Sequence, residues 1–381
     1  MKDKLLMIPG PTITPPEVAA ALAKPPLGHR SKEFAALFSA TEKRLRGVFQ
    51  TENEVLIYTS SGTGAMEAAV VNLLSPGDKA INVSIGVFGD RLAKILKQFG
   101  AEVVELKFAE GTAADPAQVK EAIAANPDAK ALYITFNETS TGVVNDLTEI
   151  IPAAKAAGLL TIVDAISGLV AMDLPTDKLG IDVVVAGSQK AFGIPPGLAF
   201  CTVSDAAWKA YETAKMPKFY WDFGAMRKAQ AKGSTAWTPS VSLVFGLEAA
   251  VQLIAEEGLP ACFARHKRNG DMVRAAMKAL GLNLFADETH ASNAVTSIHA
   301  PQAFGEDKLR GIINKQFDIV TTGGQGGLKG KIFRIGHLGF CYPRDIMATI
   351  AAFEYALYEL KWDFELGAGI AAAIKTMKGA E

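Results

Sequence analysis

The chain is poor in cysteine, nearly balanced in charge and without long apolar runs. Its 381 residues include three cysteines, Cys201, Cys262 and Cys341, which lie far apart and in no metal-ligand spacing. Such a sparse, odd number argues against a disulfide framework and is typical of a reducing compartment. The formal net charge of −1 gives no indication of a basic nucleic-acid surface or of an acidic tail.

Apolar segments are too short for a membrane span or an export signal. Residues 1–9 contain too short an apolar run for a signal peptide, and no stretch approaches the roughly 20 residues that span a bilayer. The histidines show no metal-binding spacing; they are His29, His266, His290, His299 and His337. With 49% hydrophobic residues to fill a core, the sequence predicts a globular, cytoplasmic protein.

From residue 55 onward, short apolar runs alternate with amphipathic stretches, which is the pattern of parallel βα units. Glycines at 77, 100 and 158 mark the ends of helices before strands. The strands predicted here cover residues 55–58, 80–83, 103–106, 131–135, 159–163, 181–186 and 198–203. The helices predicted between them cover residues 64–74, 88–99, 116–125 and 147–157.

The alternation ends after residue 206, where two long helices are predicted, 240–257 and 259–280. A smaller α/β unit follows, with strands near 294–299, 319–322 and 332–335 and a closing helix near 344–360. The expected fold class is therefore α/β, with a three-layer, mostly parallel sheet and a smaller C-terminal α/β domain. The large domain is predicted at 16–255 and the small one at 256–381, with residues 1–15 associated with the small domain or with the entrance to the site.

Two predicted strands end on side chains that suit one kind of chemistry. The run from Ile181 rises into Gly187-Ser-Gln-Lys190, which presents a lysine at the carboxyl end of a buried strand. The preceding strand ends at Asp164. A lysine that binds an aldehyde covalently and a carboxylate that keeps a pyridine nitrogen protonated are what a pyridoxal phosphate enzyme requires. The alternative for each residue taken alone is a solvated turn lysine and a helix-capping aspartate.

A stretch of small residues, 59–67, follows the first strand and opens a helix. Small residues allow the backbone to approach an anion closely, and the first amides of a helix are free donors at the positive end of its dipole. Thr63 adds a hydroxyl. The stretch lacks the ending of a nucleotide P-loop and the spacing of a dinucleotide fingerprint, so a single phosphate group is the favoured ligand. A helix cap with no ligand is the alternative.

Further side chains are expected at the same sheet edge. Phe88 lies between glycines after the second strand, where it can stack on a flat ring or pack in the core. Residues 137–142 place hydroxyls at the end of the fourth strand. Arg334 lies among apolar neighbours in a late strand, where it either forms an internal ion pair or binds a carboxylate bidentately. Open α/β sheets bind ligands beyond the carboxyl ends of their strands, so most of these residues are predicted to form one site.

In combination, these segments resemble the class V aminotransferases, a family of fold type I pyridoxal phosphate enzymes. The similarity is greatest to the branch of alanine–glyoxylate, serine–glyoxylate and serine–pyruvate aminotransferases, and it extends over nearly the whole chain. The segments that carry it are Pro9-Gly-Pro-Thr12, Gly28-His-Arg-Ser31, Ser61-Gly-Thr-Gly64, Glu138-Thr-Ser-Thr-Gly142, Val163-Asp-Ala165, Gly187-Ser-Gln-Lys190, Pro195-Pro-Gly197 and Phe333-Arg-Ile-Gly336.

The resemblance implies a role for each site residue. Lys190 would bind pyridoxal 5′-phosphate covalently, and Asp164 would pair with its pyridine nitrogen. Arg334 would hold the substrate α-carboxylate, and His29 and Arg30 are candidates for substrate specificity. The other cofactor contacts implied are the backbone of Gly64 and Ala65, the hydroxyl of Thr63, and the side chains of Phe88, Thr139 and Gln189.

The resemblance also implies a homodimer in which the neighbouring subunit completes each phosphate site. The corresponding segment is 233–239, with Thr238 as the donor from the partner. Thr235 stands where some relatives have a tyrosine. The partners expected are therefore a second copy of the chain and small substrates, with no nucleic acid and no membrane.

The implied reaction moves an amino group from alanine or serine to glyoxylate or pyruvate by a ping-pong mechanism. Only one arginine, Arg334, can be assigned to a substrate carboxylate, which favours small substrates. One set of alternatives is another class V enzyme: an aspartate or aminoethylphosphonate transaminase, or a cysteine desulfurase or lyase. A desulfurase needs a cysteine on a loop ahead of Arg334, and residues 318–331 contain none.

Two further alternatives lie outside that set of enzymes. The first is a non-catalytic subunit that retains the fold, and intact Lys190 and Asp164 argue against it. The second is a nucleotide-binding oxidoreductase, and the missing dinucleotide fingerprint argues against it.

Overall fold

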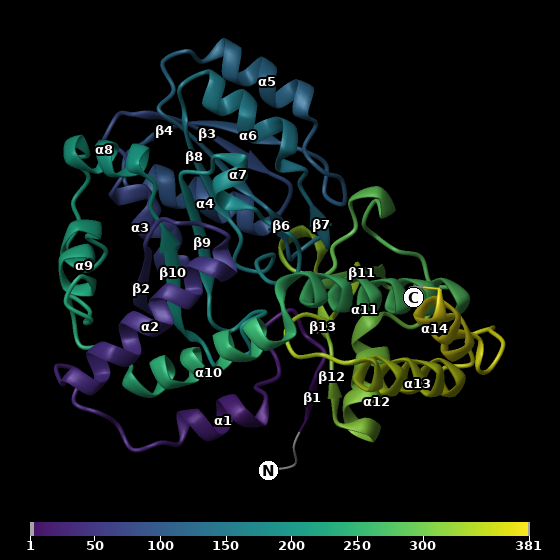
Figure 1. Cartoon of the computed structure of the whole chain (residues 1–381). Helices are drawn as coiled ribbons and strands as arrows, with labels where there is room; N and C mark the ends of the chain where they lie inside the picture. Colours follow the sequence, from purple (N-terminus) through teal and green to yellow (C-terminus); the bar gives the residue numbers. More distant parts are fainter. Residues whose placement is uncertain (1–3, 380–381) are drawn as a thin grey trace.

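A large sheet covered by helices lies beside a smaller α/β unit in the computed structural model, which describes residues 4–379 (Figure 1). The large sheet has seven strands in the order β2-β10-β9-β8-β5-β3-β4. Their bounds are β2 Val55–Ser60, β3 Lys79–Ser84, β4 Glu102–Lys107, β5 Ala131–Thr135, β8 Leu160–Asp164, β9 Val183–Gly187 and β10 Gly197–Thr202. The prediction of an α/β fold with a mostly parallel sheet is confirmed.

One strand departs from the predicted parallel series. Strand β10 runs antiparallel to both of its neighbours, β9 and β2, whereas the other neighbouring pairs are parallel. Only residues 188–196 join β9 to β10, and a parallel crossover needs about a dozen residues or more. The short connection therefore forces the chain to turn back.

Helices cover both faces of this sheet. Successive residues of β2 enter opposite cores, with Val55 and Ile57 on one side and Leu56 and Tyr58 on the other. Because both faces of the sheet are buried, the parallel strands are continuous apolar runs in the sequence. The helices of this unit are α1 Pro16–Leu22, α2 Lys32–Phe49, α3 Gly62–Val71, α4 Val87–Gln98, α5 Pro116–Ala125, α6 Leu147–Ala156, α7 Thr176–Leu179, α8 Asp205–Thr213, α9 Phe223–Gln230 and α10 Val241–Glu257.

The smaller unit has a three-stranded antiparallel sheet, in the order β11-β14-β13, and a third core of its own. Its strands are β11 Val295–His299, β12 Ile319–Val320, β13 Thr322–Gly323 and β14 Ile332–Gly336, and its helices are α11 Leu259–Ala279, α12 Glu306–Phe317, α13 Pro343–Glu359 and α14 Ala368–Lys378. The single strand predicted at 319–322 is wrong. The chain leaves one sheet at Val320 and enters another at Thr322.

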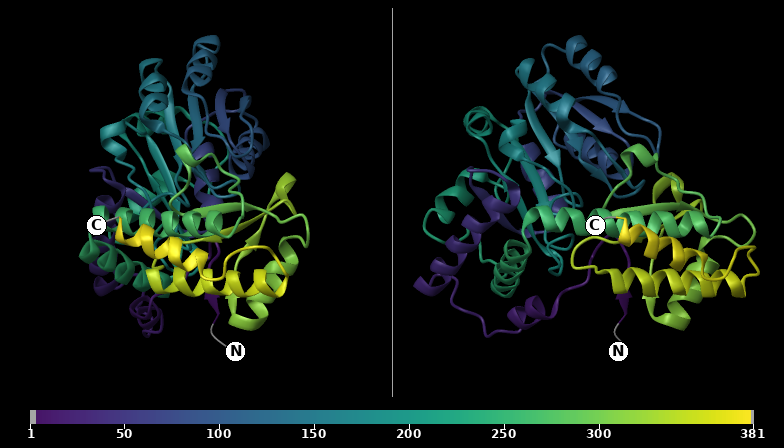
Figure 2. Two further views of the ribbon diagram at one scale, coloured as in Figure 1. Left: turned by 90° about the vertical axis from the view of Figure 1, so that its right-hand side faces the viewer. Right: turned by 45° about the vertical axis from the view of Figure 1, so that its right-hand side comes forward.

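The helix predicted near 344–360 as the last one is followed by another helix, α14. Helix α14 follows α13 and packs against α11, as Figure 2 shows. Short elements complete the structure: β1 Leu5–Leu6, the hairpin of β6 Asn137–Glu138 and β7 Val143–Val144, and the 3-10 turns Glu288–His290 and Gly326–Leu328.

The boundary between the two units is supported by how the helices pack. Helix α10 packs against α1 and α2, whereas α11 packs against α14. This division agrees with the predicted domains, 16–255 and 256–381, which stay a prediction. Strand β1 pairs with β12, so Leu5 and Leu6 lie with the smaller unit.

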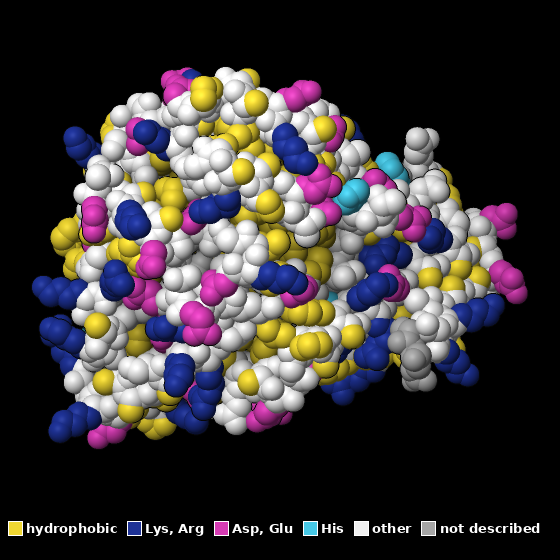
Figure 3. Space-filling model, turned by 45° about the horizontal axis from the view of Figure 1, so that its top comes forward, with side chains coloured by type: hydrophobic (Ala, Val, Ile, Leu, Met, Phe, Trp, Pro, Cys, Tyr) yellow, Lys and Arg dark blue, Asp and Glu magenta, His cyan; other side chains and the backbone are white. Residues whose placement is uncertain are grey.

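Acidic and basic side chains are intermingled on the molecular face shown in Figure 3. Within residues 4–379, no helix is long and apolar enough to cross a bilayer.

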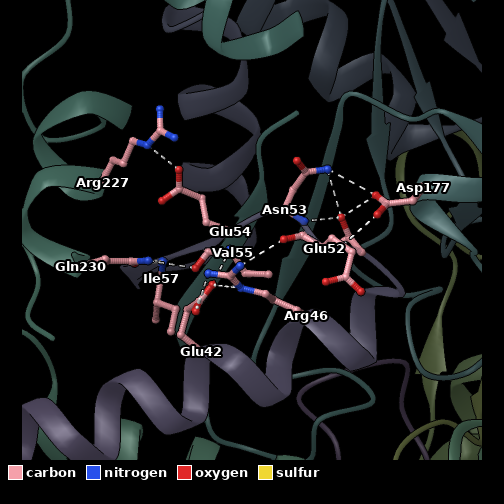
Figure 4. Close-up of polar contacts among 11 residues, drawn as sticks. Glu42, Arg46, Glu52, Asn53, Glu54, Val55, Ile57, Asp177, Arg227 and Gln230 are labelled. Carbon is pink, nitrogen blue, oxygen red and sulfur yellow. Dashed lines mark hydrogen bonds and ion pairs between the residues drawn. The ribbon is translucent and has the colours of Figure 1, made fainter. Parts of the chain in front are cut away.

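The outer edge of the large sheet is closed by side chains (Figure 4). The amide of Val55 in β2 donates to the carboxylate of Glu42 at 2.9 Å. Gln230 accepts from the amide of Ile57 at 2.7 Å and donates to the carbonyl of Val55 at 3.1 Å. Arg46 holds Glu42 through two hydrogen bonds, at 2.9 and 3.0 Å. Pairing these backbone groups with side chains prevents a second strand from adding to the edge.

Replacing Gln230 with alanine should lower the free energy of unfolding by about 1–3 kcal/mol, because two backbone groups of β2 lose their partner. The matched control is Gln252→Ala on α10, because Gln252 is exposed and its side chain donates to Glu256 on the same helix. Urea unfolding of both variants makes the comparison. An equal loss in the two variants would contradict a special role for the edge.

Candidate active site

The predicted site residues of the large unit gather at the carboxyl ends of its parallel strands. Lys190 lies in the turn after β9, and Asp164 is the last residue of β8. Thr139 lies after β5, in the turn between β6 and β7. Phe88 lies in the first turn of α4, which follows β3, and Thr63 lies in the first turn of α3, which follows β2.

Lys190 lies in a poorly solvated position. Its Nζ donates to the backbone carbonyl of Pro9 at 2.5 Å. Burial, together with the nearby positive charge of Arg334, lowers the pKa of Lys190 to about 8. A larger share of the amine is therefore neutral near pH 7 than in an ordinary lysine.

Asp164 is a buried carboxyl that accepts a hydrogen bond from the amide of Ile166 at 3.0 Å. Burial raises its pKa to about 7, and the charge of Glu138 acts in the same direction. A carboxylate in this position is stabilised when a cation lies beside it. The protonated nitrogen of a pyridine ring would be such a cation.

Thr139 links the two units of the molecule. Its hydroxyl donates to Ser167 at 2.6 Å, and Ser167 in turn donates to the carbonyl of Asn137 at 3.0 Å. The backbone carbonyl of Thr139 accepts a hydrogen bond from Arg334 of β14 at 2.9 Å. Arg334 is thereby fixed against the end of β5.

Arg334 is buried without a counter-ion among the described residues. Its other donors contact the carbonyl of Gly323, at 2.9 and 3.0 Å, and the side-chain oxygen of Gln325 at 3.2 Å. Burial lowers its pKa to about 10. The sequence leaves two roles open for Arg334, an internal ion pair and the binding of a carboxylate. Arg334 forms no ion pair within residues 4–379. An incoming carboxylate would supply the missing charge.

The start of α3 has the features of an anion site. The helix begins at Gly62, two residues before the predicted start, so Thr63 lies inside its first turn. No side chain of the described residues caps this end, and the first turn contains no acidic residue. A Cβ atom on Gly64 would lie 2.1 Å from the Ser60 hydroxyl oxygen and 2.3 Å from the Trp221 ring, so this close packing requires glycine. Ala65 follows in the same turn and is buried.

Gln189 lies beside this helix start. Its side-chain oxygen is buried and has no hydrogen-bond partner among residues 4–379, and it approaches Gly187. A buried amide oxygen without a partner is costly in an isolated protein. Together with Lys190, Asp164 and the uncapped α3, it shows that the residues present fit pyridoxal phosphate.

Glu138 is a site residue for which the sequence suggested no role. It is fully buried, and one carboxylate oxygen accepts from the amides of Phe88 and Gly89 at 3.0 and 3.1 Å. The other oxygen accepts from the amide and hydroxyl of Ser140 at 3.0 and 2.6 Å. Glu138 therefore holds the first turn of α4, which carries Phe88. The signal in the sequence is an acid three residues after the end of the buried strand β5.

The N-terminal segment, which the sequence predicts to lie with the small domain or at the entrance to the site, contacts Lys190 in the structure. Gly10 has a φ of +124°, and a Cβ atom there would lie 2.7 Å from the side chain of Lys190. Thr12 donates through its hydroxyl to the carbonyl of Lys190 at 2.6 Å. The amide of Gly336 at the end of β14 donates to Met7 at 2.9 Å. The segment therefore connects the Lys190 turn to the smaller unit.

Four predicted residues lie in a different place on the single chain. His29 and Arg30 line a surface cavity of about 510 Å³ with residues 233–237, which include Thr235. Thr238 is exposed. None of these four has a hydrogen bond to Lys190 or Asp164 within the described part of the chain. The structure does not bring them to the Lys190 site within one subunit.

No group of three or more His, Cys, Asp or Glu side chains suited to a metal ion occurs within residues 4–379.

Known proteins similar to this chain are mainly aminotransferases. Residues 8–332 match the family described as aminotransferase class V. A solved structure, ureidoglycine–glyoxylate aminotransferase from Bacillus subtilis, superposes with a TM-score of 0.96 at 27% identity and covers 99% of each chain. The L-aspartate–glyoxylate aminotransferase of Paracoccus denitrificans is 36% identical, over 97% of this chain and 94% of that protein. The soluble hydrogenase 42 kDa subunit of Anabaena cylindrica is 47% identical, over 98% of this chain and 99% of that protein.

Proposed function

The chain belongs to the class V aminotransferases, which are pyridoxal phosphate enzymes, and we propose that it moves an amino group between small substrates. The proposed donor is alanine or serine, and the proposed acceptor is glyoxylate or pyruvate, in a ping-pong reaction. Glyoxylate is named in both the P. denitrificans and the B. subtilis enzymes, whereas their amino donors differ. This supports glyoxylate as the acceptor and makes aspartate the main alternative donor.

The observation that carries the proposal is the placement of Lys190, Asp164 and Arg334 around one sheet edge. The cofactor supplies an electron sink next to the reacting carbon. Asp164 would hold the pyridine nitrogen in its protonated form, and Lys190 Nζ would take the proton from the substrate Cα. Thr63, Gly64, Ala65 and Gln189 would hold the phosphate end.

Small substrates are supported by the position of Arg334 near Lys190. Arg334 is buried, close enough to lower the pKa of Lys190, and without an ion pair in the described residues. It would bind the α-carboxylate that every amino acid and 2-oxo acid carries. A dicarboxylic substrate needs a second cation for its distal group. Arg91, the other arginine that lowers the pKa of Lys190, donates to Thr63 at the start of α3 and is not assigned to a substrate carboxylate.

A cysteine desulfurase is disfavoured by the positions of the thiols. The three cysteines are buried, and the pKa of the Cys341 thiol is raised to about 12 by burial. A thiol in that state is a poor nucleophile at neutral pH.

A homodimer with shared sites is also part of the proposal. Phe219 is 74% exposed and stacks on Trp237, with ring centres 4.6 Å apart. Tyr220 extends this aromatic surface, which lies next to Thr238. Exposed aromatic clusters of this kind are typical of interfaces. In such a dimer Thr238, His29 and Arg30 would reach the site of the other subunit. If the sites are shared, mixing Thr238→Ala chains with Lys190→Ala chains should raise the activity above that of either variant alone, because one site of each mixed dimer is then intact.

Replacing Arg334 with alanine should lower kcat/KM for alanine and for glyoxylate. The expected loss of transition-state stabilisation is about 2–5 kcal/mol, as for other buried charge pairs. Arg334→Lys should recover little, because an ammonium cannot reproduce a planar two-point contact. Coupled assays with alanine, serine, aspartate and glutamate as donors, and glyoxylate, pyruvate and 2-oxoglutarate as acceptors, provide the measurement.

The control is Arg344→Ala, because Arg344 is 83% exposed and lies at the start of α13. It should leave the kinetics unchanged. A strong preference of the wild type for aspartate or 2-oxoglutarate would refute the small-substrate proposal. Unchanged kinetics in Arg334→Ala would refute the carboxylate role.

A further inference from the structure

Arg91 lies between two parts of the cofactor site, next to Phe88 and to Thr63. It is one turn after Phe88 on α4, and its guanidinium carbon lies 4.7 Å from the centre of the Phe88 ring. Its Nη1 donates to the hydroxyl of Thr63 at 3.3 Å. The guanidinium therefore spans the distance from the expected ring-binding residue to the first turn of α3.

The charge of Arg91 is not neutralised by a carboxylate in the described residues. The neighbouring Asp90 instead accepts from Ser84 at 2.9 Å and lies 3.3 Å from Lys107. The start of α3 offers no acidic side chain either. The positive charge of Arg91 extends into the site, because it lowers the pKa of both Asp164 and Lys190.

A phosphate dianion needs more positive charge than the start of one helix supplies, because the helix dipole is equivalent to roughly half an elementary charge. Thr63 and the first amides of α3 donate hydrogen bonds but carry no net charge. Guanidinium groups bind phosphate oxygens through short, charge-assisted hydrogen bonds. A cation within reach of Thr63 and without an anionic partner matches this need.

We propose that Arg91 binds the phosphate group of the cofactor, together with Thr63 and the first amides of α3. This inference rests on the same cofactor site as the proposed function. Arg91 would fix the phosphate from the α4 side, opposite Gln189. The contact between Arg91 and Phe88 would fix the two side chains relative to each other. Both residues lie in the first turns of α4, which Glu138 holds through the amides of Phe88 and Gly89.

The test compares two ligands that differ only in the phosphate. Dissociation constants for pyridoxal 5′-phosphate and for pyridoxal are measured by visible absorbance and tryptophan fluorescence in the wild type, Arg91→Gln and Arg91→Lys. Arg91→Gln should weaken binding of pyridoxal 5′-phosphate roughly 10- to 100-fold, the range expected for a lost charge-assisted bond. Binding of pyridoxal should change less than about twofold, and inorganic phosphate should compete less well. Arg91→Lys should recover part of the loss.

The matched control is Lys94→Gln, an exposed residue on the same helix, which should leave both constants unchanged. If Arg91→Gln does not fold, a several-fold lower preference for the phosphorylated ligand in Arg91→Lys tests the same inference. Equal weakening of both ligands would show that Arg91 acts only through the ring and would overturn the proposal. So would unchanged cofactor binding with a raised KM for alanine or glyoxylate, which would assign Arg91 to the substrate.

The proposed function is tested separately on the wild-type holoenzyme. Addition of alanine or serine should convert the bound cofactor and change its visible absorbance. If the wild type binds the cofactor and no amino acid changes its absorbance, the proposed function fails, whereas the comparison of the two ligands still decides the role of Arg91.

Discussion

Replacing Lys190 with alanine should lower transamination by roughly 10⁴-fold or more, because one residue holds the cofactor and moves the proton at the substrate Cα. In the wild type, borohydride should fix the cofactor on Lys190, which mass spectrometry of the digested protein would detect. The variant should retain its fold and still bind the cofactor without a covalent bond. A small amine added to the solution should restore part of the activity.

The control for this experiment is Lys209→Ala, because Lys209 is exposed on α8, away from the strand ends. It should keep full activity and the borohydride adduct. An adduct on another lysine, or turnover of Lys190→Ala near the wild-type level, would show that the site is assigned wrongly.

The lowered pKa of Lys190 also predicts how cofactor addition depends on pH. Burial disfavours the protonated amine, so at pH 7 a pKa of about 8 leaves roughly one-tenth of it neutral. An ordinary lysine, with a pKa of about 10.4, would be less than about 0.1% neutral. The rate of covalent cofactor binding should therefore rise about tenfold per pH unit up to about pH 8 and then level off. A rise that continues to pH 10 would contradict a lowered pKa.

Much of the site could be predicted because it follows from the parallel sheet. Strands buried on both faces are continuous apolar runs in the sequence, and their carboxyl ends lie at one edge. Asp164 ends one such strand, and Lys190 lies in the turn after the next one. Because the two strands are parallel neighbours, both side chains lie at the same edge. The uncapped start of α3 follows from the small residues after the first strand.

Other parts could not be predicted because they depend on contacts between distant segments. The carbonyl of Pro9 reaches Lys190 because β1 pairs with β12, more than 300 residues away in the chain. Glu138 acts on backbone amides of α4, which no side-chain pattern reveals. The direction of β10 depends on the length of the turn that carries Lys190. Helices α1 and α2 were also not predicted.

Replacing Asp164 with asparagine should lower transamination by roughly 10³-fold, because it removes the anion that stabilises a protonated pyridine when negative charge enters the ring. Asparagine has nearly the same shape, and its oxygen can still accept from the amide of Ile166. The loss should therefore appear in kcat more than in substrate binding. Absorbance of the bound cofactor as a function of pH would report the altered protonation of its ring nitrogen. The exposed Asp205→Asn on α8 is the control.

Asp164→Asn lowers activity, but it should raise the stability of the protein without cofactor near neutral pH. The pKa of Asp164 is raised to about 7 in the folded chain, whereas an unfolded aspartate titrates near 3.9. Between these values the folded state binds the proton more tightly, so the wild type loses stability as the pH rises from about 4 to 7. Asparagine carries no such charge, and Asp164→Asn should flatten this decline. A variant that is both inactive and less stable at pH 8 would indicate that Asp164 supports the fold, whereas an inactive variant of equal or greater stability would indicate that the carboxylate is retained for catalysis.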